Sequence, residues 1–293
     1  MIRETATMPE TAGPVSNVSD TAHWVAAYRA LESARPDALF HDPLAERLAG
    51  ETGKAIVAGE GSNAMAGWPL VTRTKVIDDL IAETLSKGCD LVINMAAGMD
   101  ARPYRLDLPA DLRWIEVDFP DLIAEKNRLL EDETPRCELT RAAVDLADPA
   151  ARDQFLNQAL EGAKKALVLT EGLVYYLSDD EVSGLASALA RPEIAWWIMD
   201  VNNKPVVDRF NRVNKKLLEN SPWKFGPLEP LRFFADAGWT ADEVVGLFRM
   251  AARFRRLPPL LWSLAFAPVG PRMPLGAKRI PWYGAVRLTH TGK

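Results

Sequence analysis

Short apolar runs alternate with longer helical segments through the middle of the chain. The apolar runs are Asp90–Met95, Trp114–Val117, Thr140–Val144, Ala166–Thr170 and Ile194–Val201. Helix-like segments separate them, at Pro120–Leu130, Pro149–Leu160 and Asp179–Ala190. Buried strands that alternate with helices are typical of a parallel sheet with helices on both faces. The pattern therefore predicts an α/β fold.

The segments before and after this region have a different pattern of apolar and polar positions. On the N-terminal side we expect helices from Ser19 or Asp20 to Ser33, over Pro43–Leu48 and over Pro69–Leu85, with loop or weak helix at Gly50–Gly67. After Asp200 we expect helices at Pro205–Leu218 and Leu231–Ala237. Two late strands, Trp262–Phe266 and Gly284–Leu288, would form an antiparallel edge.

Composition narrows the class of protein. Hydrophobic residues make up 48%, charged residues 26%, and the formal net charge is −5, which describes an ordinary globular chain and argues against nucleic acid as the main partner. Two cysteines, Cys89 and Cys137, cannot build a disulfide framework, and no metal-ligand spacing is present. We find no secretory signal and no apolar run that could span a bilayer, so we expect a cytoplasmic protein without a membrane partner.

Candidate chemistry lies where the predicted strands end. Ala96, Ala97 and Gly98 follow the first strand, and Asp118, Asp145 and Glu171 follow the next three. Open parallel sheets bind ligands at the carboxyl ends of their strands. Each acid taken alone could equally be a helix cap, but the ordered set indicates a ligand site.

Each of these positions suits one part of an adenosyl ligand. Small residues let a ligand lie against the first turn, and Asp118 stands at a distance from Gly98 typical of the acid that binds a ribose diol. Asp145 could accept from an adenine amino group while Leu146 packs on the ring, and Glu171 could hold an ammonium. The first turn has a single glycine, followed by Asp100, which disfavours the pyrophosphate of NAD.

Several strings resemble one enzyme family in order. They are Phe40–Ala45 (FHDPLA), Thr72–Thr74, Asn94–Leu106 (NMAAGMDARPYRL), Trp114–Pro120 (WIEVDFP) and Thr170–Leu177 (TEGLVYYL). Together they resemble the leucine carboxyl methyltransferase family, which includes bacterial polyketide O-methyltransferases. The sequence departs from the family at Ala96, where glycine is usual, and at His41, where aspartate is expected.

The resemblance implies a fold, a cofactor and a set of contacts. The fold is a Rossmann-like class I methyltransferase, with a seven-stranded, mostly parallel sheet and an N-terminal helical lid. The cofactor is S-adenosylmethionine, released as S-adenosylhomocysteine. Its site would comprise Arg73 at the carboxylate, with Ala96, Gly98, Asp118, Asp145, Leu146 and Glu171.

The predicted elements also set boundaries along the chain. Residues 1–19 would be a flexible arm, and residues 20–293 one domain. Within it we expect a helical cap at 20–88, a cofactor-binding core at 89–201, a lid insertion at 202–261 and C-terminal strands at 262–293.

The predicted function is O-methylation of a carboxyl or hydroxyl group on a small apolar or aromatic metabolite, as in secondary metabolism. Aromatic residues that could line the acceptor pocket, or merely cover the sheet, are Trp24, Tyr28, Trp68, Phe210, Trp223 and Phe225. Tyr175 is the one weak catalytic candidate, and core packing is the stronger interpretation of it. The alternatives are methylation of a protein C-terminus and cofactor binding without catalysis. Neither the oligomeric state nor the acceptor follows from the sequence.

Overall fold

The computed structural model describes residues 18–59, 67–215, 221–267 and 280–290. Its centre is a seven-stranded sheet with the order β3-β2-β1-β4-β5-β7-β6. The strands are β1 (Leu91–Met95), β2 (Arg113–Asp118), β3 (Glu138–Ala143), β4 (Ala166–Thr170), β5 (Ile194–Asn202), β6 (Trp239–Gly246) and β7 (Tyr283–His290). Strands β1 to β5 pair in parallel, whereas β7 is antiparallel to both of its neighbours. The expected fold class is confirmed.

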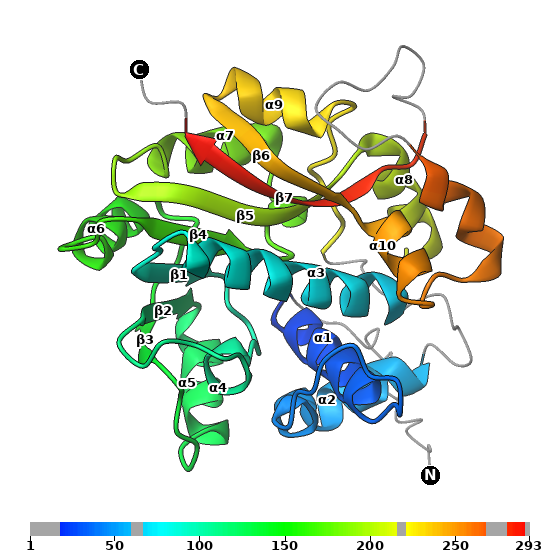
Figure 1. Cartoon of the computed structure of the whole chain (residues 1–293), viewed down its shortest axis with the longest axis horizontal. Helices are drawn as coiled ribbons and strands as arrows, with labels where there is room; N and C mark the ends of the chain where they lie inside the picture. Colours follow the sequence, from blue (N-terminus) through cyan, green and yellow to red (C-terminus); the bar gives the residue numbers. More distant parts are fainter. Residues whose placement is uncertain (1–17, 60–66, 216–220, 268–279, 291–293) are drawn as a thin grey trace, which may run out of the picture.

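Helices cover the sheet and extend to one side of it (Figure 1). They are α1 (Val18–Ser33), α2 (Ala45–Gly59), α3 (Gly67–Ser86), α4 (Arg102–Arg105), α5 (Pro120–Leu129), α6 (Pro149–Ala159), α7 (Asp179–Ala188), α8 (Lys204–Val213), α9 (Pro230–Asp236) and α10 (Leu247–Arg253), with 3-10 turns η1 (Val174–Tyr176) and η2 (Pro259–Phe266). Helix α3 crosses the sheet face, and α1 and α2 pack as a pair beside it. Among the residues that the structure describes, no helix is long and apolar enough to cross a membrane.

The burial of the central strands explains why their sequences are continuous apolar runs. Every residue of β1 and of β4 is buried. Strands that are covered on both faces lose the alternation of half-exposed strands. The strand order reverses direction at β1, which has β2 on one side and β4 on the other. This is the switch point at which such sheets bind ligands.

Two expectations about local structure are wrong. Residues Trp262–Phe266 form part of η2 rather than a strand, because Pro258 and Pro259 fix φ and supply no N–H to a ladder. The sheet position is taken by β6, whose register shifts between Ala241 and Glu243 and so breaks the alternation that would reveal it.

The helix α2 also runs further than expected. It continues to Gly59, through a kink at Gly50, where the backbone has φ 55°. The helix predicted at Pro205–Leu218 ends at Val213, and residues 216–218 of that prediction lie outside the described residues. The other predicted elements are confirmed within a few residues. The arm predicted at 1–19 lies almost wholly outside the described residues, and the domain boundaries remain a prediction.

Candidate functional site

A cavity of about 170 Å³ lies at the carboxyl ends of β1, β2 and β4. Its sheet side is formed by the turn after β1 together with Asp118, Glu171 and Gly172. Its other walls come from α1, from α3 and from Trp223. The cavity thus stands at the switch point of the sheet and is covered by the N-terminal helices.

The turn after β1 brings a backbone segment close to α1. Gly98 has φ 49°, and a Cβ placed there would lie 3.0 Å from the Cβ of Ala22. The Gly98 N–H donates to Asp118 at 2.7 Å, and the Phe119 N–H donates to the other carboxylate oxygen at 2.8 Å. Burial raises the pKa of Asp118, although these two bonds oppose the rise. Only glycine fits position 98 without strain or a shift of α1.

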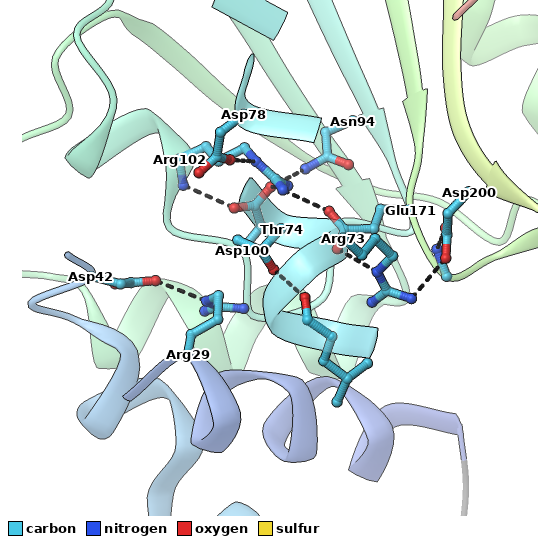
Figure 2. A network of polar contacts seen from close by, with 12 residues as sticks. Arg29, Asp42, Arg73, Thr74, Asp78, Asn94, Asp100, Arg102, Glu171 and Asp200 are labelled. Atoms are coloured by element: carbon cyan, nitrogen blue, oxygen red, sulfur yellow. Dashed lines mark hydrogen bonds and ion pairs between the residues drawn. The ribbon is translucent and has the colours of Figure 1, made fainter. Parts of the chain in front are cut away.

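A buried ionic network forms one wall of the cavity (Figure 2). Arg73 donates from Nε to Glu171 at 2.8 Å and from Nη1 to Asp200 at 2.9 Å. Arg102 contacts the second oxygen of Glu171 at 2.7 Å. Although burial raises the pKa of Glu171, these two arginines lower it below its ordinary value. The Glu171 carboxylate therefore stays ionised.

The network continues toward the helical cap. Arg102 also contacts Asp78 at 2.7 Å and Asp100 at 2.8 Å, and Arg105 binds Asp78. On the α1 side, Arg29 is paired with Asp42 at 2.8 Å (Figure 2). Arg102 and Arg105 are thus internal ion-pair partners.

The charges of this network do not cancel. Four arginines face five carboxylates, those of Asp42, Asp78, Asp100, Glu171 and Asp200. Asp118 adds a further carboxylate to the cavity lining. The excess lies behind the cavity lining, whose own three arginines and three carboxylates balance, and a wall of negative charge close to a partly closed cavity favours a cationic ligand.

Aromatic rings form the opposite wall. Trp223 is stacked between Tyr175, at 4.3 Å between ring centroids, and Phe210, at 3.5 Å. Asn211 holds the backbone of Trp223 by two hydrogen bonds. Because both faces of the Trp223 ring are covered, only an edge of it is available to a ligand in the cavity.

Two indole N–H groups of this wall are unpaired. The Nε1 atoms of Trp24 and Trp223 are buried without a hydrogen-bond partner among the described residues. Trp223 is close enough to the Tyr176 hydroxyl to lower the pKa of that group, which burial raises overall, but the pair does not reach ordinary hydrogen-bond geometry. An indole nitrogen can only donate, so these groups favour a ligand atom that accepts.

The cavity brings together most of the residues expected at the cofactor. Arg73, Ala96, Gly98, Asp118 and Glu171 all line it. Asp145 and Leu146 do not line it, and Asp145 is exposed and caps the N–H of Ala147. Of the six aromatic candidates, Trp24 and Trp223 line the cavity and Phe210 supports Trp223. Phe225 instead lies in the core against Phe233, and Trp68 packs on Phe248.

Tyr175 lines the cavity as a hydrogen-bond donor. Its hydroxyl donates to Asp200 at 2.6 Å, and burial together with that carboxylate raises its pKa well above the ordinary value. It is therefore a poor proton acceptor near neutral pH. Asp200 was not among the residues predicted from the sequence; it lies near the end of β5 and bonds Arg73 and Tyr175 from behind the cavity lining. The rule that pointed to the acids after the second, third and fourth strands points to Asp200 as well when it is applied to the fifth.

None of the three histidines of the chain lines the cavity. His23 bonds the Leu48 carbonyl through Nδ1 at 2.9 Å, His41 is exposed, and His290 packs against Trp239. The usual general base of proton-transfer chemistry is therefore missing from the lining.

Comparison with known proteins agrees with this geometry. The model of the leucine carboxyl methyltransferase family matches residues 22–190. A Streptomyces avermitilis protein named "Putative S-adenosyl-L-methionine-dependent methyltransferase" is 32% identical over 261 residues, covering 83% of this chain and 91% of that one. A Parafrankia protein with the same description is 36% identical over 186 residues, covering 60% of each chain.

Solved structures resemble the fold. A DUF574 family protein from Streptomyces avermitilis has a TM-score of 0.58 at 14% identity, covering 91% of this chain and 96% of that one. A protein from Thermobifida fusca titled "putative methyltransferase" has a TM-score of 0.56 at 17% identity, covering 96% and 97%. At such low sequence identities, the structural similarity supports the fold alone.

Proposed function

The chain belongs to the leucine carboxyl methyltransferase family, and from that premise we propose that it methylates the carboxylate of a small apolar or aromatic acid. The chain is an S-adenosylmethionine-dependent methyltransferase.

The cavity wall of β1, β2 and β4 suits the cofactor. Bound S-adenosylmethionine supplies a methyl group on a cationic sulfonium, and the excess negative charge of the network matches that cation. Asp118 would accept from the ribose hydroxyls with the lone pairs that Gly98 and Phe119 leave free.

Arg73 and Glu171 would hold the amino-acid end of the cofactor. Arg73 uses Nε and Nη1 in its two ion pairs, so Nη2 takes no part in either and suits the cofactor carboxylate. Glu171 suits the ammonium. Ala96 and Gly98 would lie against the methionine chain. Asp145 and Leu146 keep their proposed place at the adenine, beyond the present cavity lining.

The single observation that carries the acceptor assignment is the pair of unpaired indole N–H groups on an apolar wall. Trp24 and Trp223 line the cavity, and their indole N–H groups make no ordinary hydrogen bond within the described residues; a carboxylate would satisfy them. A carboxylate is ionised near neutral pH and needs no base, whereas a phenol or alcohol would need one. The lining contains no histidine, and its carboxylates Asp100 and Glu171 are paired with arginines.

In this arrangement the protein aligns the acceptor with the cofactor and does not activate the acceptor chemically. The aromatic wall would hold the acceptor ring and exclude water, while the indole edges orient the carboxylate toward the cofactor. Alignment of two reactants can supply much of the acceleration of a displacement.

The test compares two acceptors with the same ring. Biphenyl carboxylic acid and hydroxybiphenyl are each incubated with S-adenosylmethionine, and S-adenosylhomocysteine formation is followed across neutral pH. We expect turnover of the acid, with kcat independent of pH. Turnover of the phenol alone, rising with pH, would contradict the proposal.

Two controls address the rival functions. Preferential methylation of a peptide that ends in a free leucine carboxylate would favour the protein-directed reaction. Binding of S-adenosylmethionine without turnover of any acceptor would favour a cofactor-binding protein without catalysis.

A further inference from the structure

The last fifty residues carry a charge unlike the rest of the chain. Residues 244–293 contain nine basic residues and no acidic residue, whereas the first 243 contain 26 basic residues and all 40 acidic ones. The overall net charge of −5 hides this division. A strongly basic segment on an acidic protein indicates a surface with its own partner.

Part of that segment exposes large apolar side chains. In η2, the next element after the basic helix α10, Leu260 is 80% exposed, Trp262 is 58% exposed and Phe266 is 84% exposed. No residue of η2 is buried, and all of its residues except Ser263 are apolar. Exposed apolar side chains grouped in this way mark an interaction surface.

The basic and apolar groups are adjacent. Helix α10 packs against η2, and Arg249 donates from Nε to the carbonyl of Ala265 in η2 at 3.5 Å. Arg253 and Arg255 are exposed at the end of α10 and just after it, in the segment that leads to η2. We call this surface, formed by Arg249, Arg253, Arg255, Leu260, Trp262 and Phe266, the basic-apolar patch. Figure 1 shows α10 and the segment that follows it (orange) at one end of the molecule.

The patch is fixed to the body of the protein. Arg256 follows α10 and pairs with Glu32 at 2.7 Å and with Asp37 at 3.0 Å, both near the C-terminal end of α1. Phe248 of α10 packs on Trp68 of α3 at 5.2 Å between centroids. Arg256 is thus used structurally, which leaves Arg249, Arg253 and Arg255 at the surface.

We propose that the basic-apolar patch docks the enzyme on a membrane surface that contains anionic phospholipids. Arginines beside exposed leucine, tryptophan and phenylalanine side chains are the composition of segments that lie in the headgroup region, with apolar groups entering the acyl boundary. A second copy of this chain fits less well, because a symmetric contact would place arginines against arginines.

This docking is peripheral and reversible. It concerns a surface separate from the cavity lining and does not depend on the identity of the acceptor.

The experiment measures co-sedimentation of the full-length protein with vesicles. One set is phosphatidylcholine alone, and the other contains about one third phosphatidylglycerol. We expect at least roughly tenfold stronger partitioning onto the anionic vesicles, lost at about 0.5 M salt because screening shortens the reach of the charges.

Two double variants and one matched control separate the contribution of the arginines from that of the apolar side chains. Arg253→Glu with Arg255→Glu should remove the preference for anionic vesicles, by roughly fivefold or more per charge. Trp262→Ser with Phe266→Ser should weaken binding to both vesicle types. Leu228→Ser with Arg232→Glu changes an exposed apolar and an exposed basic residue elsewhere, and should leave partitioning unchanged.

Three results would overturn the proposal: no binding to either vesicle, equal binding to both, or a dimer in light scattering that Trp262→Ser with Phe266→Ser dissolves. S-adenosylmethionine affinity, measured on every variant, should stay constant, which shows that the variants are folded and keeps this test separate from that of the proposed reaction.

Discussion

Arg73 of α3 and Asp200 of β5 form a buried ion pair at 2.9 Å, although 127 residues separate them in the sequence. Asp200 also accepts from the Gly172 N–H at 2.7 Å and from the Tyr175 hydroxyl at 2.6 Å. One carboxylate therefore fixes the arginine proposed to bind the cofactor, the turn after β4 and the aromatic wall. Asp200 is a positioning residue that links the two halves of the cavity.

Replacement of this carboxylate should affect both stability and cofactor affinity. Asp200→Asn keeps the volume but removes the charged acceptor of Arg73 Nη1 in the interior, so that Glu171 is the only carboxylate left in an ion pair with Arg73 among the described residues. Breaking a buried ion pair costs about 3 kcal/mol or more, so we expect a fall of that order in the free energy of unfolding in urea. Weaker S-adenosylmethionine binding should accompany it, measured by calorimetry.

An exposed ion pair provides the matched control. Lys204 and Asp208 pair at 2.8 Å on the surface of α8. Asp208→Asn should change the free energy of unfolding by less than about 1 kcal/mol. Equal effects of Asp200→Asn and Asp208→Asn would show that the buried pair has no special role.

The turn after β1 contains a backbone strain that a single substitution should relieve. Ala96 has φ 53°, a left-handed conformation that residues with a Cβ adopt at a cost. Ala96→Gly should therefore raise the free energy of unfolding by about 1 kcal/mol, seen as a higher urea midpoint at unchanged slope. Ala97→Gly is the control at an adjacent position with ordinary backbone, and it should destabilise. A loss of stability in both variants would mean that the turn carries no such strain.

The sequence predicted the sheet well because its central strands are buried on both faces and bounded by helices. The acids after β2 and β4 were predictable for the same reason, since parallel strands bring their carboxyl ends to one edge. The pairing of Arg73 with Asp200 was not predictable from spacing, because it depends on how α3 crosses the sheet. The irregular β6 and the proline-initiated η2 were missed because local backbone chemistry overrides the apolar pattern there.

Cofactor affinity should depend on pH through Asp118. Burial raises the pKa of Asp118 above its ordinary value of 3.8, whereas arginines lower the pKa values of Asp100 and Glu171. As the pH falls, Asp118 is therefore the first of these three carboxylates to take up a proton. Its protonated form accepts fewer bonds from a ribose diol, so S-adenosylhomocysteine affinity should decline on acidification with a midpoint above 3.8.

The variant Asp118→Asn isolates this effect. It should bind S-adenosylhomocysteine roughly tenfold or more weakly near neutral pH, since bonds to a charged acceptor are worth about 1.5 to 3 kcal/mol. The remaining affinity of this variant for S-adenosylhomocysteine should no longer decline on acidification. Retention of the same pH dependence in the variant would assign the titration to another group.

The indole donors should act on the acceptor rather than on the cofactor. Trp24→Phe and Trp223→Phe keep a ring in the wall but remove the N–H groups that have no partner. If those groups hold the acceptor carboxylate, each change should raise KM for the acid roughly tenfold, with a smaller effect on kcat and none on S-adenosylmethionine affinity.

Trp114→Phe is the matched control, because Trp114 also has a buried unpaired Nε1 but lies in the core below the cavity lining. Loss of the same N–H there should leave KM unchanged, so a rise in KM confined to Trp24 and Trp223 would identify recognition. A fall in kcat at constant KM in the two cavity variants would instead mean that these rings only shape the wall.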